Sequence, residues 1–340
     1  MPDLSKFPVN PRENILKFLH HESTKMIPNF LLSVSSFGVG IGGPGPVFEG
    51  GPVGGGCDGF GSKWLAPSSG GGAPMVDTTK IVLDDIEDWR TVPIPDVNTY
   101  DWASDAARDL AAVNRDLQIV DYCLGYGPFM RLTYLMGFEN ALISMITNPE
   151  DINDFFTVLI DHKIAMLDKV IEYYHPDTIT FGDDIATQRS LFMSPDTYRE
   201  LIKPHHKRFV KACLDRGVIP IYHLCGLADN IIEDIIDCGW AAWTVIQPIN
   251  DICGMIEKYG DRIGFIGGYD SNGKPALESA TPEEIQAEIR RCYDTYGKYG
   301  KGYAFFGYRV INSPDPSDVA KAMGAIAQYS IQYGLQSMTP

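Results

Sequence analysis

From about residue 118 onward, the chain alternates short apolar runs with longer amphipathic ones. The runs that predict strands are residues 118–124, 178–181, 219–224, 243–246, 263–267 and 303–306, with 26–32 as a further candidate. The stretches that predict helices are residues 154–174, 195–216, 228–238, 282–296 and 317–333. Such alternation predicts parallel strands joined by helical crossovers. We therefore expect an α/β fold, a distorted (β/α)8 TIM barrel whose missing strand lies between residues 33 and 117; a doubly wound open sheet is the alternative.

One segment, residues 38–72, departs from this pattern because it holds 15 of the 34 glycines. No helix-forming sequence follows its first glycines, which argues against a dinucleotide-binding loop. We predict a long irregular N-terminal loop, and long loops in compact domains often act as lids over a site. The length of 340 residues is otherwise that of a single barrel domain spanning residues 1–340.

Charge and cysteine content exclude several classes of protein. The formal net charge of −16, with scattered Lys and Arg, argues against a nucleic-acid partner. The sequence contains no run of about 18 apolar residues, which a membrane helix would need, and its polar start is not typical of a secretory signal. Seven irregularly spaced cysteines do not form a disulfide framework. We therefore expect a reduced, cytoplasmic protein.

The most informative segment is 219–226, a buried-strand pattern that ends in His-x-Cys-Gly. Alternation places His223 and Cys225 on the same face of the strand, where both can point into the mouth of a barrel. Imidazole and thiolate are preferred zinc ligands, and a catalytic zinc keeps one position open. The sequence therefore predicts a zinc site here, with a core histidine beside a buried cysteine as the alternative.

Polar residues at other strand ends are candidates for the same site. Asp183 and Asp184 come where one strand ends, and Asp270 follows another. Gln247 and Arg309 lie at the ends of two further predicted strands. Because the carboxyl ends of barrel strands meet at one face, we expect the three aspartates to be catalytic and the other two to contact substrate.

Aromatic and histidine residues complete the set. The aromatic residues expected to line a substrate pocket are Tyr126, Phe129, Tyr222, Trp243, Tyr269 and Tyr308, each with an ordinary core position as the alternative. His205 and His206 are adjacent on a predicted helix and therefore point in different directions, so that one metal cannot easily use both. We predict that they lie on the helix surface.

Several motifs, in order along nearly the whole chain, resemble those of the uroporphyrinogen decarboxylase superfamily. They are residues 12–19, 57–64, 136–141, 181–184, 194–200, 223–226 and 267–270. The resemblance implies a distorted TIM barrel with its pocket at the carboxyl ends of the strands. It also implies one of two activities, decarboxylation of a porphyrinogen or zinc-dependent methyl transfer linked to a corrinoid.

The sequence favours the methyltransferase branch. For the decarboxylase branch, the resemblance implies arginines in an N-terminal glycine-bearing loop that hold the eight carboxylates of a porphyrinogen, and bidentate arginine is the natural partner of a carboxylate. No arginine occurs between Arg12 and Arg90. The His-x-Cys-Gly motif of the methyltransferases is present at residues 223–226. The resemblance thus implies zinc as cofactor, similar to methylcobalamin:coenzyme M methyltransferases and O-demethylase methyltransferases.

One departure changes the expected substrate. In thiol-methylating members a third ligand, a cysteine, follows a late strand, but residues 306–312 contain none. Cys57, Asp183 and Asp184 are candidates to complete the site. We expect a small methylated or methoxylated substrate, such as a methoxyaromatic compound, and a corrinoid carried by a partner protein, because no corrinoid-binding Asp-x-His-x-x-Gly segment is present. A decarboxylase of the same fold and a non-catalytic binding protein are the alternatives.

Overall fold

A computed structural model of the chain describes residues 7–39, 46–52, 54–66, 75–309 and 316–336. Its centre is a curled sheet of seven parallel strands in the order β1-β5-β6-β7-β8-β9-β10. The strands are β1 Val34–Val39, β5 Ile119–Leu124, β6 Thr178–Gly182, β7 Ile219–His223, β8 Ala242–Ile246, β9 Gly264–Gly268 and β10 Tyr303–Phe306. Because spatial order follows chain order without a reversal, the doubly wound alternative is wrong. The architecture is that of a TIM-like barrel.

The place of an eighth strand is taken by a single bridge. Asn29 pairs in parallel with Phe305, whose backbone N–H donates to the carbonyl of Pro28 at 2.8 Å. The chain then enters the one-turn helix α2, Phe30–Ser33, before β1 begins. The strand predicted at 26–32 is therefore wrong, and the strand expected between residues 33 and 117 is β1. The other six predicted strands are confirmed.

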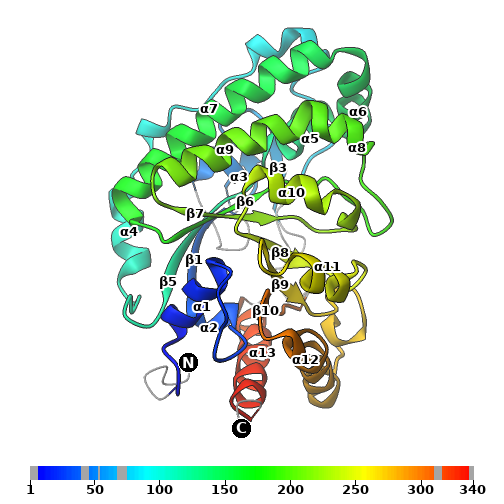
Figure 1. The fold of residues 1–340 in the computed structure, drawn as a ribbon. Helices are drawn as coiled ribbons and strands as arrows, with labels where there is room; N and C mark the ends of the chain where they lie inside the picture. The colour runs from blue at the N-terminus through cyan, green and yellow to red at the C-terminus, as the bar shows by residue number, and fades with distance from the viewer. Residues whose placement is uncertain (1–6, 40–45, 53, 67–74, 310–315, 337–340) are drawn as a thin grey trace.

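Helices cover the outside of the sheet, with α7 and α9 on one side and α11, α12 and α13 on another (Figure 1). The α-helices are α1 Pro11–Leu19, α2 Phe30–Ser33, α3 Val47–Gly50, α4 Trp102–Leu110, α5 Pro128–Met136, α6 Phe138–Thr147, α7 Pro149–Tyr174, α8 Pro195–Thr197, α9 Lys203–Asp215, α10 Ile232–Cys238, α11 Ile252–Tyr259, α12 Pro282–Tyr296 and α13 Pro316–Gln336. Short turns of 3-10 helix are η2 Ile86–Thr91, η3 Val97–Thr99, η5 Asp229–Ile231, η6 Lys274–Ala276 and η7 Gly297–Tyr299. The π-helix η4, Tyr198–Ile202, joins α8 to α9.

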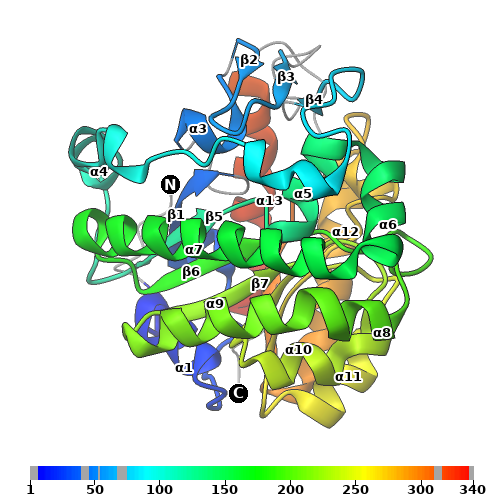
Figure 2. The ribbon, with the colours of Figure 1, turned by 90° about the horizontal axis from the view of Figure 1, so that it is seen from above.

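Local sequence signals fix several helix ends. Thr281 and Glu284 form a reciprocal capping box at the start of α12, with Pro282 in the first turn. Gly239 ends α10 in the left-handed conformation, at φ 93°. These ends agree with the predicted helix ranges 282–296 and 228–238. In Figure 2, α7 and α9 run side by side across one face, and the small sheet β2-β3-β4 lies on the opposite side of the molecule from α10 and α11.

The interior of the barrel is apolar at one end. Its buried cluster includes Ile119, Ala242 and Ile266 from the strands, and Ile15 and Phe18 from α1. Because Ile119 and Ala242 are the first residues of β5 and β8, α1 covers the amino ends of the strands. The carboxyl ends are thus left for a site, as in other barrels.

The described part of the Gly-rich segment contains regular structure, which corrects the prediction of an irregular loop. It contains a small antiparallel sheet of β2 Gly56–Cys57 and β3 Lys63–Leu65, which β4 Met75–Val76 extends just beyond the segment. Residues 40–45, 53 and 67–74 lie outside the described part. Whether the segment acts as a lid stays a prediction.

A buried ionic cluster fastens this segment to the barrel. The carboxylate of Glu49 accepts from Lys163 Nζ at 2.6 Å, lies 2.8 Å from His162 Nε2 and 3.2 Å from Arg131 Nη2. Arg131 Nη1 donates to Asp58 at 2.6 Å. All five side chains are almost completely buried. Such a cluster ties Glu49 and Asp58 of this segment to α5 and α7, because separating its charges would leave them unpaired in the core.

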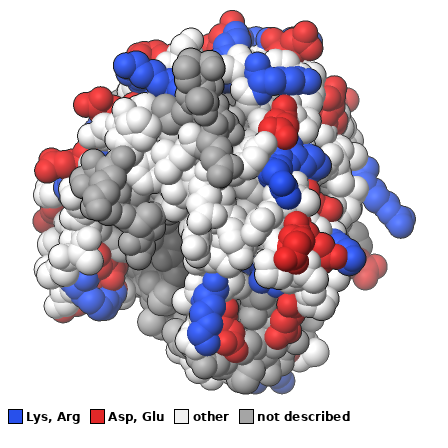
Figure 3. Space-filling model, turned by 90° about the horizontal axis from the view of Figure 1, so that it is seen from below, with Lys and Arg blue, Asp and Glu red and all other residues white. Residues whose placement is uncertain are grey.

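The surface charge, the helix lengths and the cysteines can be compared with the sequence predictions. On the face drawn in Figure 3, acidic and basic side chains are intermingled, and the described residues form no basic patch there. No helix in the described ranges is both long and apolar enough to span a bilayer. All seven cysteines lie in the described part, and no disulfide bond joins any of them.

Candidate functional site

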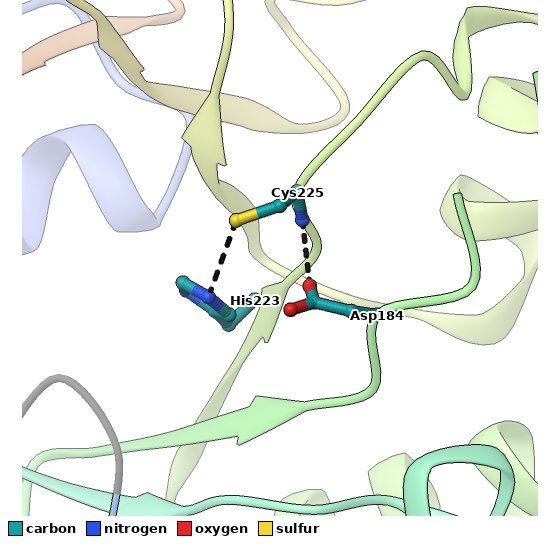
Figure 4. Close-up of side chains that lie close together, drawn as sticks. All are labelled: Asp184, His223 and Cys225. Carbon is teal, nitrogen blue, oxygen red and sulfur yellow. Dashed lines mark hydrogen bonds between the residues drawn. The ribbon is translucent and has the colours of Figure 1, made fainter. Parts of the chain in front are cut away.

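Three side chains from neighbouring strand ends converge at the carboxyl face of the sheet. Asp184 follows β6, His223 is the last residue of β7, and Cys225 comes two residues later. One ligand atom from each lies within 4.8 Å of the others. Figure 4 shows Cys225 above the imidazole and the carboxylate and in contact with both, with its Sγ 3.7 Å from His223 Nε2. The structure therefore brings together the predicted ligand pair and one of the three candidates for a third ligand.

Strand alternation and one glycine build this arrangement. His223 pairs in register with Gly182 of β6, which brings the two strand ends together. The backbone N–H of Cys225 donates to Asp184 Oδ1 at 2.8 Å and holds the carboxylate toward the thiol. Gly226 then turns the chain at φ 103°, where a Cβ would lie 2.7 Å from the carbonyl oxygen of Thr187. The glycine of His-x-Cys-Gly is thus required by a close approach between two loops.

Burial controls the charge of all three groups. It raises the pKa of the Cys225 thiol well above its usual range, and the nearby Asp184 carboxylate raises it further. Burial also raises the pKa of Asp184, against the opposing effect of His223. The pKa of His223 is lowered by burial. Without a metal the thiol is therefore protonated and the imidazole neutral at pH 7, so that a metal ion would displace the thiol proton.

The donor set fits zinc. A tetrahedral zinc with Zn–S of about 2.3 Å and Zn–N of about 2.0–2.1 Å places sulfur and nitrogen about 3.6 Å apart. The observed separation between Cys225 Sγ and His223 Nε2 is 3.7 Å. One thiol, one imidazole and one carboxylate provide three ligands, the number in catalytic zinc sites that keep a fourth position for substrate.

The three clustered residues line a cavity of about 570 Å³. Tyr126, Tyr308 and Arg309, which were predicted to contact substrate, line it together with the three clustered residues. The other lining residues are Cys123, Gly125, Met130, Tyr134, Gly182, Val245, Phe306 and Met323. Tyr134 was missed because it lies within α5, where no strand end or motif marks it. One signal was available, because Tyr134 lies about two turns into a helix that follows the end of β5.

Other predicted site residues lie away from the cavity. Tyr222 is fully buried on the opposite face of β7, stacked on Trp240. Tyr269 is buried and donates to the carbonyl of Pro275 at 2.8 Å. Asp270 accepts the backbone N–H of Gly273 at 2.8 Å and thereby shapes its own loop. These three residues stabilise the walls of the barrel instead of lining the cavity.

Gln247 acts one layer behind the cavity. Its side-chain oxygen accepts the backbone N–H of Gly226 at 2.8 Å, and its amide nitrogen donates to Ser271 at 3.1 Å. It therefore links the loops that follow β7, β8 and β9. Cys57, a candidate third ligand, is exposed on β2 and faces Lys63 across the small sheet.

Asp183 points away from its neighbour Asp184. It is fully buried, and its carboxylate accepts from His206 Nε2 at 2.9 Å and from the backbone N–H of Met130 at 2.9 Å. The prediction that His205 and His206 lie on the helix surface is wrong, because α9 packs against both α7 and α10. His205 is buried against Asn153 of α7, with its Nε2 2.6 Å from the amide oxygen.

These positions give the two adjacent aspartates opposite expected roles. Asp183→Asn should lower the free energy of unfolding by about 1–3 kcal/mol, because it replaces a buried acceptor of several hydrogen bonds, and should leave metal stoichiometry unchanged. Asp184→Asn should weaken metal binding with a smaller effect on stability. Urea unfolding and metal analysis of the two variants measure this. Loss of metal in Asp183→Asn without loss of stability would contradict the assignment.

Comparison with known proteins places this geometry in a family. The profile of the uroporphyrinogen decarboxylase (URO-D) family matches residues 58–329. The chain belongs to the uroporphyrinogen decarboxylase family. A solved structure described as a methyltransferase from Methanosarcina mazei has a similar fold, with a TM-score of 0.70 over 95% of this chain and 99% of that one. At 16% identity, that likeness concerns the fold alone.

Relatives within the URO-D family have two kinds of name. A methylcobamide:CoM methyltransferase of Methanosarcina barkeri is 28% identical over 145 residues, 43% of this chain and 41% of the relative. A methylated-thiol–coenzyme M methyltransferase of Methanosarcina mazei is 24% identical over 165 residues, 48% of this chain and 42% of the relative. A uroporphyrinogen decarboxylase of Methylococcus capsulatus is 26% identical over 208 residues, 59% and 53% of the two chains. The chain thus spans about half the length of the curated relatives it matches.

Proposed function

We propose that this member of the URO-D family is a zinc-dependent methyltransferase. It would move a methyl group between a small methylated or methoxylated compound and the cobalt of a corrinoid held by a separate protein. The observation that carries the proposal is the cluster of Asp184, His223 and Cys225, whose donor atoms suit zinc and face a cavity. Relatives named as methyltransferases support the same reaction class.

The composition of the cavity favours this reaction over porphyrinogen decarboxylation. Arg309 is the one Lys or Arg side chain among its described lining residues, and its Nη2 already donates to the carbonyls of Leu277 and Glu278. A substrate with eight carboxylates would need several cationic partners. The buried Arg131 cannot supply one, because Asp58 and Glu49 already neutralise it.

The protein's own residues would prepare the reaction in three ways. Cys225 would lose its proton on binding a metal, and its backbone N–H holds Asp184 in place. Apolar side chains such as Met130, Val245 and Phe306 keep water from the methyl group. When bound, zinc supplies Lewis-acid stabilisation of the heteroatom that loses or gains the methyl group. The cavity would also have to admit the corrinoid, whose cobalt would accept or supply the methyl group.

An anaerobic assay with cob(I)alamin as methyl acceptor tests the proposal. Zinc-loaded protein with anisole should form methylcobalamin, seen in the visible spectrum, whereas Cys225→Ser protein should form at least about 100-fold less. Cys57→Ser protein, altered at an exposed thiol, should match wild type. No methyl transfer from a panel of methoxylated, methylthio and methylamino compounds, with zinc bound, would reject the proposal.

A further inference from the structure

One wall of the cavity is built from two tyrosines backed by a tryptophan. The rings of Tyr126 and Tyr134 meet edge to face, with centroids 5.2 Å apart. Trp64 of β3 contacts both rings, with centroid distances of 5.3 Å to Tyr126 and 5.4 Å to Tyr134. Trp64 is almost completely buried, whereas the two tyrosines are partly exposed to the cavity. The small sheet in the Gly-rich segment therefore supports an aromatic surface of the site.

The backbone and a buried cation hold this wall in place. Tyr126 adopts φ 61°, a left-handed conformation that a bulky residue rarely takes, directly after Gly125 at the end of β5. Such strain is retained where surrounding structure enforces it, often at functional sites. The Arg131 guanidinium lies 5.8 Å and 5.9 Å from the two tyrosine rings on the side of the core. Asp58 fixes that guanidinium at 2.6 Å.

The tyrosine hydroxyls take no part in holding the wall together. Among the described residues, neither Tyr126 nor Tyr134 has a hydrogen-bond partner for its hydroxyl. Burial raises the pKa of Tyr126 to about 12 and raises that of Tyr134 further. Both hydroxyls therefore stay protonated and uncharged at pH 7. The wall presents ring surface and neutral donors, with no charge of its own.

We infer that Tyr126 and Tyr134 form the surface against which the enzyme binds a planar aromatic ring of an uncharged substrate. The inference rests on the proposed function and names its substrate class, an aryl methyl ether or a close analogue. Ring–ring contacts add to the apolar burial that an aliphatic compound of equal size would also gain. An anionic substrate gains little, because Arg309 is the one charged group of the described lining other than the metal ligands, and its Nη2 already donates to the carbonyls of Leu277 and Glu278.

Isothermal titration of the zinc-free protein with two matched probes tests the inference. Anisole and methoxycyclohexane carry the same methoxy group on a flat aromatic and a puckered aliphatic ring. Wild type should bind anisole about tenfold more tightly, and should bind 4-methoxybenzoate no more tightly than anisole. Equal affinities for anisole and methoxycyclohexane would overturn the inference without the need for any variant.

Substitutions of Tyr134 locate the effect. Tyr134→Leu should lose most of the tenfold preference for anisole, while Tyr134→Phe, which keeps the ring, should retain it within threefold. Tyr173→Leu, a matched change of a half-buried tyrosine on α7 outside the cavity, should bind both probes as wild type does. An unchanged preference in folded Tyr134→Leu protein would also overturn the inference.

This titration can succeed or fail independently of the methyl-transfer assay, because it involves no metal, no corrinoid and no methyl transfer. Zinc binding and methyl transfer without aromatic preference would reject the substrate class alone. Aromatic preference without methyl transfer would reject the proposed reaction and leave the wall as a ligand-binding surface.

Discussion

Replacing His223 or Cys225 by alanine is expected to weaken zinc binding about 100-fold or more. Zinc sites in peptides bind with roughly 10–16 kcal/mol over four ligands, so that one ligand accounts for about 3 kcal/mol. Competition with a chromophoric chelator measures the affinity of each variant. Matched controls are Cys57→Ser and His20→Ala, at two exposed positions outside the cluster. Zinc affinities within threefold of wild type in both the His223 and the Cys225 variant would show that these residues do not bind zinc.

The same titrations should depend steeply on pH. Because burial keeps the Cys225 thiol protonated at pH 7, zinc would have to displace its proton, and binding would release that proton to solvent. The apparent affinity should therefore rise about tenfold per pH unit between about pH 6 and 8. In Cys225→Ala protein the residual affinity should be much less dependent on pH in this range. An equally steep rise in that variant would assign the displaced proton to another group.

The second large effect concerns stability. Glu49→Gln should lower the free energy of unfolding by about 3–5 kcal/mol, because Lys163 and Arg131 would lose their buried anionic partner. Urea unfolding at pH 7 measures the change. Glu139→Gln, on the exposed surface of α6, is the matched control and should change stability by less than about 0.5 kcal/mol. A Glu49→Gln protein as stable as this control would show that the cluster does not fasten the Gly-rich segment.

The stability difference should itself vary with pH. Burial alone would raise the pKa of Glu49, but Lys163, His162 and Arg131 outweigh it and hold that pKa well below its usual range. A carboxylate whose folded pKa is depressed contributes stability above its unfolded pKa and loses it as pH falls through the folded value. The difference in the free energy of unfolding between wild type and Glu49→Gln should have its full value at pH 7 and should decrease below about pH 4.5.

Much of the barrel could be predicted because its signals are local. Buried parallel strands give short apolar runs, and six of the seven expected runs are strands. The seventh, at 26–32, failed because apolar content alone does not distinguish a strand from a short buried helix such as α2. The small sheet of the Gly-rich segment escaped because its strands have only two or three residues, too few to show a period.

Part of the candidate site could be predicted for a similar reason. The two-residue period that turns His223 and Cys225 inward also turns Tyr222 outward, so that its expected place in the pocket contradicted the same rule. Which of Asp183 and Asp184 would face the cavity depends on loops beyond the strand, and no period governs those. The burial of His206 depends on the packing of α9 between other helices, which is a tertiary property.

In the proposed site, Asp184, His223 and Cys225 together hold one zinc ion. X-ray absorption at the zinc edge of protein loaded with one equivalent tests it most directly. We expect one sulfur neighbour at about 2.3 Å and the remaining nitrogen and oxygen neighbours at about 2.0–2.2 Å. In Cys225→Ser protein the sulfur neighbour should disappear. A spectrum without sulfur in the wild-type protein, or with two or more sulfur neighbours, would contradict the account.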